Sequence, residues 1–113
     1  MTQYLLAIDQ GTTGTKVLVM DTQLNPVAEK STPFEQHFPK PGWVEHDLNQ
    51  VWSSVQAGID HVVTKIDPNQ IVGIGITNQR ETICFWDKKK VGHLAEISDI
   101  FFGISKKPDI LVG

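Results

Sequence analysis

A turn rich in glycine and threonine follows the first apolar run of the chain, and its residue types suit anion binding. Asp9 ends that run, and Gln10-Gly11-Thr12-Thr13-Gly14-Thr15-Lys16 follows it. Glycines let a backbone approach an anion closely, threonine hydroxyls donate hydrogen bonds, and Lys16 adds positive charge. The cluster therefore suits a phosphate group. Asp9 is a candidate for holding Mg²⁺ through water, because Mg²⁺ keeps much of its hydration shell.

Residue types alone leave a second interpretation of this turn open. The spacing is not Gly-x4-Gly-Lys-Ser/Thr, so the turn is no Walker A loop, and it is no dinucleotide-binding fingerprint either. A polar hairpin turn without any ligand accounts for the same residues, because short motifs recur by chance.

A second polar cluster, residues 77–82, separates two apolar runs and reads Thr-Asn-Gln-Arg-Glu-Thr. Arg80 and Glu81 are suited to binding hydroxyl groups, because a guanidinium donates hydrogen bonds and a carboxylate accepts them. The alternative is a solvated loop with a surface ion pair worth about 0–1 kcal/mol.

Other reactive residue types give weaker signals. The four histidines show no metal-ligand spacing and are expected at the surface; they are His37, His46, His61 and His93. Cys84 lies in an apolar stretch, which favours a small buried side chain over a nucleophile.

Five short strands are expected to position the two polar clusters. Apolar and β-branched runs predict strands over 4–8, 15–20, 27–32, 71–76 and 83–86. The first is expected to be central and buried on both faces, and to form a hairpin with the second. The third precedes Pro33 and is predicted to lie at an edge.

The fourth of these strands is predicted to be buried, with Gly73 and Gly75 allowing a helix or another backbone to approach. The segment from Phe34 to Glu45 is predicted to be an irregular loop, because it contains two prolines and a glycine.

One amphipathic helix is predicted between the third and fourth strands. Asp47 can cap its first turn, with Gln50 three residues on as in a capping box, and Pro68 ends it. Its apolar face is formed by Leu48, Val51, Trp52, Val55, Ile59, Val62, Val63 and Ile66. The order β-β-β-α-β-β predicts an α/β layer with a mixed sheet.

Composition restricts the class of protein. The chain has 113 residues, which is enough for one domain, and a formal net charge of −3. The acidic balance argues against a nucleic-acid or anionic-membrane binder. The single cysteine excludes an intrachain disulfide, and no apolar run is long enough to span a membrane. The first residues lack the pattern of a signal peptide, so a cytoplasmic protein is expected.

Three motifs in this order resemble the N-terminal lobe of the FGGY carbohydrate kinases, and within that family its glycerol-phosphorylating members. They are Asp9-Gln10-Gly11-Thr12-Thr13, the segment 40–47 (Lys-Pro-Gly-Trp-Val-Glu-His-Asp) and the segment 75–82 (Gly-Ile-Thr-Asn-Gln-Arg-Glu-Thr). The resemblance implies a ribonuclease H-like fold of the actin/hexokinase/Hsp70-like superfamily, here as an incomplete first lobe. The activity it implies is ATP-dependent phosphorylation of glycerol to glycerol 3-phosphate.

The same resemblance assigns roles to matching residues. Asp9 would lie near Mg²⁺ and the phosphates of ATP or ADP, and Gly11, Thr12 and Thr13 would form the phosphate loop. Gly14 and Lys16 would flank that loop, while Arg80 and Glu81 would bind the hydroxyls of glycerol or a related polyol. The aspartate that acts as general base belongs to a second lobe in this family. Full-length relatives are expected to be homo-oligomers.

The chain also departs from the resemblance. Glycerol-phosphorylating members usually carry Ser-Ser-Arg at Gly14-Thr15-Lys16, and lysine lacks the bidentate fork of arginine. The resemblance covers 1–88, so we expect a truncated lobe over 1–88 and a tail of unknown origin over 89–113.

The tail and the function each leave alternatives open. In the tail, Leu94, Ile97, Ile100, Phe101 and Ile104 have the spacing of a helical face. The tail is therefore expected to be a short helix or an unrelated sequence. Two alternatives to the glycerol-phosphorylating activity remain: a non-catalytic remnant that binds phosphate or polyol, and a fragment of another FGGY sugar kinase.

Overall fold

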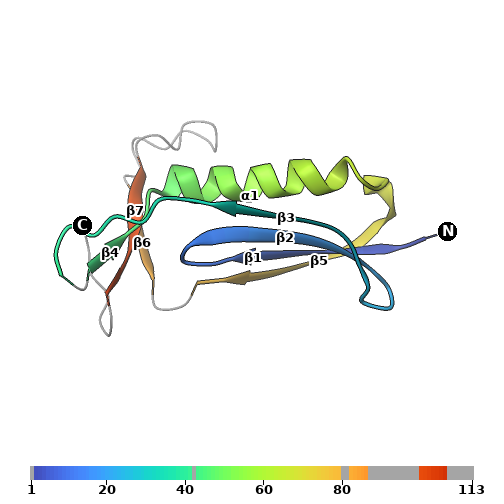
Figure 1. Ribbon diagram of the computed structural model, residues 1–113, viewed down its shortest axis with the longest axis horizontal. Coiled ribbons are helices and arrows are strands. Elements are labelled where there is room, and N and C mark those ends of the chain that lie inside the picture. Colours follow the sequence, from blue (N-terminus) through green and yellow to red (C-terminus); the bar gives the residue numbers. More distant parts are fainter. Residues whose placement is uncertain (1, 42, 80–81, 87–99, 107–113) are drawn as a thin grey trace.

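The fold is known from a computed structural model that describes residues 2–41, 43–79, 82–86 and 100–106. Two sheets and one long helix make up the described part (Figure 1). The larger sheet has the order β3-β2-β1-β5, and the smaller one has the order β4-β7-β6. The elements are β1 (Tyr4–Gln10), β2 (Gly14–Asp21), β3 (Pro26–Pro33), β4 (Trp43–Glu45), α1 (Leu48–Val63), the 3-10 helix η1 (Pro68–Gln70), β5 (Ile71–Asn78), β6 (Ile83–Trp86) and β7 (Ile100–Lys106).

The larger sheet is mixed, as predicted. β1 pairs with β2 and β2 with β3 in antiparallel hairpins, whereas β1 pairs with β5 in parallel. The parallel pair needs a crossover, and α1 supplies it. β1 is central and β3 is an edge strand, which confirms both predictions.

The core lies between α1 and one face of the larger sheet. Figure 1 shows α1 running along β3 and β2, and its contacts are mainly with these two strands. Five apolar residues are buried between them: Leu6, Ile8, Val17, Val19 and Val62. The alternating strand positions Leu5 and Ala7 face the other side and are half-buried, so β1 is fully buried on one face rather than on both.

Helix α1 begins and ends close to the predicted residues, but its cap differs from the capping box. The Asp47 carboxylate accepts a hydrogen bond from the Asn49 backbone N–H at 2.8 Å. The Gln50 side chain accepts instead from the Glu35 backbone N–H at 3.0 Å, so it fastens the loop after β3 to the helix. The helix ends at Val63, which leaves Ile66 beyond it, packed against the core.

Gly58 allows α1 to approach β2 closely. A Cβ atom at Gly58 would lie 2.9 Å from the Val17 Cβ and closer still to its Cγ2. Both residues are buried, so neither can move toward solvent. A glycine inside a helix costs about 1 kcal/mol relative to alanine. Glycine is required at this position despite the cost, because a larger residue would separate the helix from the sheet.

A buried hydrogen bond joins the same two elements one turn earlier. The Ser54 hydroxyl donates to the Val51 carbonyl at 2.6 Å. Since a hydroxyl has one proton, the Thr15 hydroxyl must donate to Ser54 Oγ, which lies 2.6 Å away. This bond fixes the first residues of β2 against the helix.

Strand β5 differs from the predicted buried strand. Val72, Ile74 and Ile76 are 56%, 62% and 73% exposed. Ile74 pairs with Leu6 and Ile76 with Ile8, so both side chains lie on the face that carries α1. Because α1 lies over β2 and β3, it leaves this part of β5 uncovered among the described residues.

The glycines of β5 match the expected close approach at one position only. A Cβ at Gly73 would lie 3.2 Å from the Leu5 side chain, whereas one at Gly75 would meet no described atom within 4 Å. The expectation is therefore wrong for Gly75 in the described part of the chain.

The loop after β3 is more regular than predicted. Trp43–Glu45 forms β4, and His37 and Glu45 exchange two backbone hydrogen bonds of 2.9 and 2.8 Å. The prolines at 39 and 41 lie within the resulting hairpin, where no ladder bond is required of them. β4 pairs with β7, a partner distant in sequence, which explains why the local sequence did not predict it.

The predicted tail helix is wrong for Ile100, Phe101 and Ile104, which belong to strand β7. β7 lies between β4 and β6, so cross-strand pairing overrides the helical spacing. Leu94 and Ile97 lie outside the described residues, as does His93.

His46 corrects the prediction that the histidines lie at the surface. Its side chain is completely buried, and both ring nitrogens lack a hydrogen-bond partner among the described residues. The ring packs edge-to-face on Phe34, with centroids 5.3 Å apart. Burial lowers the pKa of His46 below its ordinary value of 6.5, and this is the largest effect on it. The Glu35 backbone raises the pKa, and the nearby His37 lowers it.

We expect Gly58→Ala to lower the free energy of unfolding by about 1–3 kcal/mol, because the new methyl group over-packs the contact with Val17. Urea unfolding of the 113-residue chain measures this. In a Val17→Ala background the same substitution should cost less, since the nearer of the two colliding atoms, Cγ2, is gone and only the Cβ remains. Equal costs in both backgrounds would contradict the close approach.

We expect the free energy of unfolding to fall as the pH drops from about 7.5 to about 5.5, with His46 contributing to this slope. The unfolded chain binds a proton on His46 near pH 6.5, whereas the folded chain takes it up only at lower pH. His46→Phe should flatten the slope in urea titrations at several pH values. A slope that stays the same in His46→Phe would contradict the assignment.

Candidate functional site

The two polar clusters of the sequence meet at one end of the larger sheet. Asp9 of β1 is paired with Lys16 of β2 on one side and with Thr77 of β5 on the other. Gln10 is likewise paired with Asn78. Since β1 and β5 are parallel, their carboxyl ends lie together, which brings the turn after β1 beside the segment after β5.

The turn between β1 and β2 is closed by its own backbone. The Gly11 N–H donates to the Gly14 carbonyl at 2.9 Å. Gly14 lies very close to β3. A Cβ atom at this position would be 2.8 Å from the Thr32 carbonyl oxygen and 3.0 Å from the Pro33 Cα. A side chain at this position would push the turn away from its neighbouring strand.

A cavity of about 340 Å³ opens at this turn. The residues that line it are Asp9, Gly11, Thr13, Gly14, Thr15, Lys16, Ser31, Thr32 and Pro33. Five of the six predicted phosphate-loop residues are therefore brought together, and Thr12 is the one that does not line the cavity. The last three lining residues belong to β3 and were missed. Pairing the third predicted strand with the second in an antiparallel register would have found them, since Ser31 lies opposite Lys16.

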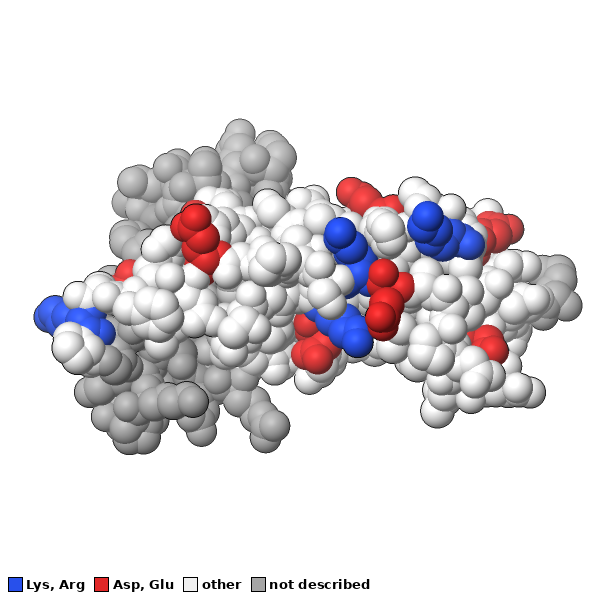
Figure 2. Space-filling model, viewed as in Figure 1, with Lys and Arg blue, Asp and Glu red and all other residues white. Residues whose placement is uncertain are grey.

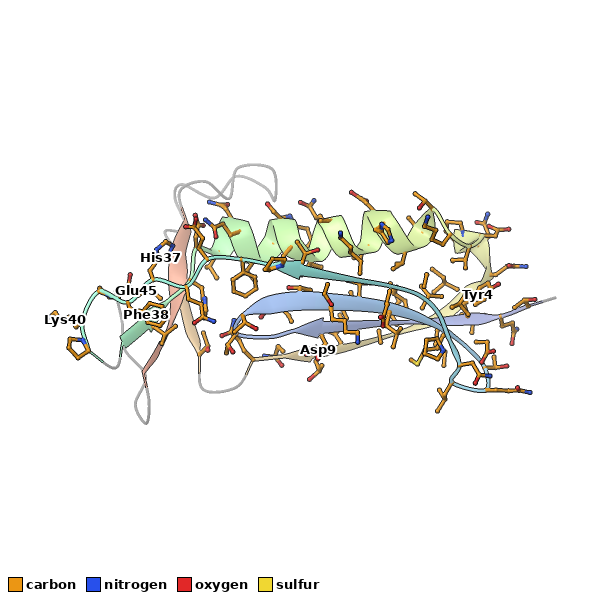
Figure 3. All side chains as sticks on the ribbon, viewed as in Figure 1. Tyr4, Asp9, His37, Phe38, Lys40 and Glu45 are labelled. Carbon is orange, nitrogen blue, oxygen red and sulfur yellow. The ribbon has the colours of Figure 1, made fainter. Side chains whose placement is uncertain are left out.

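The charged residues of the cavity lie on the face of the sheet opposite to α1. Figure 3 shows Asp9 on that side, as its alternation with the buried Ile8 requires. The Lys16 ammonium lies 3.3 Å from the Glu29 carboxylate, and both side chains are more than half exposed. Such a pair contributes about 0–1 kcal/mol to stability, so Lys16 remains available to an anion. Figure 2 likewise shows positive and negative side chains next to one another on the visible face.

Asp9 is an exposed carboxylate beside Lys16. No group of three or more histidine, cysteine, aspartate or glutamate residues in the described ranges is placed to hold a metal ion. One exposed carboxylate beside a turn suited to phosphate fits an ion held largely by water and phosphate oxygens. It does not fit an ion enclosed by protein ligands.

The second polar cluster is tied to the first through side-chain amides. Gln79 Nε2 donates to Gln10 Oε1 at 3.2 Å, and the Thr82 hydroxyl donates to Gln79 Oε1 at 2.9 Å. The predicted substrate residues Arg80 and Glu81 lie between Gln79 and Thr82 in sequence and outside the described residues. The side chain of Cys84 also lies outside them. In the parts of the chain that are described, no helix is long and apolar enough to cross a membrane.

Solved structures with the same fold define the class. The gluconate kinase of Lactobacillus acidophilus superposes with a TM-score of 0.76 over 92% of this chain and 20% of its own, at 24% identity, which shows the fold alone. The glycerol kinase of Plasmodium falciparum with ADP gives a TM-score of 0.72 at 32% identity, over 92% of this chain and 20% of that one. The chain therefore has the first-lobe fold of the sugar kinases, which are actin/hexokinase-like ATPases.

The family model for the N-terminal domain of the FGGY carbohydrate kinases matches residues 4–98, and the chain belongs to this family. Among curated proteins, the glycerol kinase of Ligilactobacillus salivarius is 51% identical over 89 residues. That of Oceanobacillus iheyensis is 52% identical over 88 residues. These matches cover 77% and 76% of the chain but only 18% of each relative, so the chain spans about a fifth of their length.

We expect Gly14→Ala to displace the turn and enlarge or distort the cavity, because the new Cβ would meet backbone atoms of β3. The free energy of unfolding should fall by about 1–3 kcal/mol, and amide NMR signals of 11–14 should shift. Gly75→Ala places a methyl group in open space and serves as the control. Similar effects of the two substitutions would show that β3 does not restrain the turn.

Proposed function

We propose that this chain supplies the phosphate-binding wall of a kinase cleft that phosphorylates glycerol to glycerol 3-phosphate with ATP. The observation that carries the proposal is the cavity at the β1–β2 turn, where Gly11, Gly14, Thr13 and Lys16 converge beside Asp9. The likeness to glycerol kinases favours glycerol as the substrate class. The protein of Plasmodium falciparum solved with ADP favours an adenine nucleotide.

In this proposal the residues of the cavity act on the phosphates of the nucleotide. Backbone N–H groups of the turn and the Thr13 hydroxyl donate hydrogen bonds to phosphate oxygens, and Lys16 offsets their charge. Asp9 would hold Mg²⁺ through water, and the bound ion would supply further charge neutralisation. Phosphoryl transfer depends mainly on such positioning and electrostatic stabilisation.

Arg80 and Glu81 are the proposed polyol ligands. They follow β5, whose end lies beside the phosphate site, so a hydroxyl bound there would be close to the transferred group. The general base is expected outside this chain, in the part of the relatives that it does not span. We therefore expect binding without turnover from the 113 residues alone.

We place the protein in the cytoplasm and expect full-length relatives to associate with themselves. The division into a lobe over 1–88 and a tail over 89–113 stays a prediction.

Two further functions are kept because specific observations favour them. The polar cavity at the β1–β2 turn would equally serve a non-catalytic module that binds phosphate or polyol. The xylulose kinase of Brucella ovis, 29% identical with a TM-score of 0.68, favours a sugar substrate. Thermal unfolding with glycerol and with xylulose separates these substrates, because a ligand stabilises only the folded state it binds.

We expect isothermal titration to show binding of Mg²⁺·ADP by the 113-residue chain, and a coupled assay with ATP and glycerol to show no turnover. Asp9→Ala should weaken binding of Mg²⁺·ADP while leaving glycerol binding unchanged.

Arg80→Ala should weaken the affinity for glycerol by about five- to 150-fold, which corresponds to 1–3 kcal/mol. Turnover above background that Asp9→Ala abolishes would overturn the expected lack of activity. Unchanged glycerol affinity in Arg80→Ala would remove Arg80 from the site.

A further inference from the structure

Three successive carbonyl groups of the β1–β2 turn each accept a hydrogen bond. These bonds are separate from the Gly11-to-Gly14 backbone bond that closes the turn. Gln10 Nε2 donates to the Gly11 carbonyl at 2.7 Å, and Gln36 Nε2 donates to the Thr12 carbonyl at 2.8 Å. The Phe34 backbone N–H donates to the Thr13 carbonyl at 3.3 Å. The donors come from β1 and from the loop after β3, so the turn is held from two sides.

Peptide planarity makes these bonds relevant to anion binding. In a trans peptide the N–H of one residue points opposite to the carbonyl of the residue before it. Holding the Gly11 and Thr12 carbonyls therefore sets the directions of the Thr12 and Thr13 N–H groups. Neither N–H has a hydrogen-bond partner among the described residues, so both are available to a ligand.

Gln36 is itself fixed by its neighbours on either side. The Glu35 N–H donates to Gln50 Oε1 at 3.0 Å, which ties the loop to helix α1. His37 exchanges backbone hydrogen bonds of 2.9 and 2.8 Å with Glu45. Figure 3 shows His37 and Glu45 close together in this hairpin. The backbone around Gln36 is thus restrained before its side chain reaches the turn, 24 residues away in sequence.

Gln10 is restrained in a similar way through its side chain. Its Oε1 accepts from Gln79 Nε2, which leaves its Nε2 directed at the Gly11 carbonyl. Gln79 accepts in turn from the Thr82 hydroxyl, so the orientation of the Gln10 amide is determined at both ends.

We propose that Gln36 is a positioning residue for phosphate binding: it holds the Thr12 carbonyl, next to the Gly11 carbonyl that Gln10 holds, so that the N–H of Thr13, which lines the cavity, faces the anion. The inference rests on the proposed function, because it requires phosphate to bind at this turn. It adds a residue from the loop after β3, which the polar clusters of the sequence did not include. Gln36 acts through the backbone of the turn and does not itself touch the anion.

The test measures binding of inorganic phosphate and of Mg²⁺·ADP to the 113-residue chain, followed through the amide NMR signals of Thr12 and Thr13. Gln36→Met keeps an unbranched side chain of similar length without a donor. It should weaken phosphate and Mg²⁺·ADP by about three- to tenfold, as expected for one lost hydrogen bond. Gln36→Glu should weaken both further, because its carboxylate cannot donate and repels the anion.

Two readouts separate positioning from a merely structural role. The urea-unfolding midpoint and the glycerol affinity should stay at the wild-type values in Gln36→Met. Gln56→Met replaces an exposed glutamine of α1 and should change none of the measured quantities. Parallel losses of stability, glycerol affinity and phosphate affinity in Gln36→Met would mean that Gln36 only supports the fold, and would overturn the inference.

The outcomes also separate this inference from the proposed function. Wild-type affinity for phosphate in both Gln36 variants would overturn the positioning role alone. Absence of phosphate and Mg²⁺·ADP binding in the wild-type chain would overturn the proposed function, and the positioning role with it.

Discussion

The close contact between α1 and β2 is the constraint on which the candidate site depends. Gly58 brings the helix against Val17, and the buried bond between Thr15 and Ser54 holds the adjacent part of the strand. Thr15 and Val17 flank Lys16, so two buried residues on the helix side fix the residue that points to the opposite face. The anchored start of β2 therefore determines where the turn and its cavity lie. A residue larger than glycine at position 58 would move the sheet, and the turn with it.

The parallel pairing of β1 and β5 gives the site its second component. It places Thr77 and Asn78 beside Asp9 and Gln10, although these pairs are 68 residues apart in the chain. The amide-to-amide bond from Gln79 to Gln10 extends this proximity beyond the ends of the strands. An anion at the turn and a hydroxyl ligand after β5 would thus share one scaffold. This geometry is what the proposed transfer between nucleotide and polyol requires.

The sequence predicted the parts of this molecule that follow from local pattern. Asp47, the apolar face of α1 and the glycine-threonine turn carry their own signals, and the helix and the hairpins agree with the structure. Five of the six candidate phosphate-loop residues line one cavity, and their role in binding phosphate stays a prediction. Features that depend on distant partners were not predicted. β4 exists because it pairs with β7, Ile74 is exposed because α1 lies over other strands, and His46 is buried by the fold of its loop. Gln36 has no motif, and only its contact with the Thr12 carbonyl identifies it.

A crystal structure of the 113-residue chain with Mg²⁺·ADP tests the central claim most directly. We predict a phosphate group within hydrogen-bond distance of the Thr13 N–H, close to Lys16 and with Asp9 facing the ion. We also predict that the Gln36 bond to the Thr12 carbonyl persists in the complex. A nucleotide bound with its phosphates elsewhere, for example in the groove between the end of β3 and helix α1, would contradict the account.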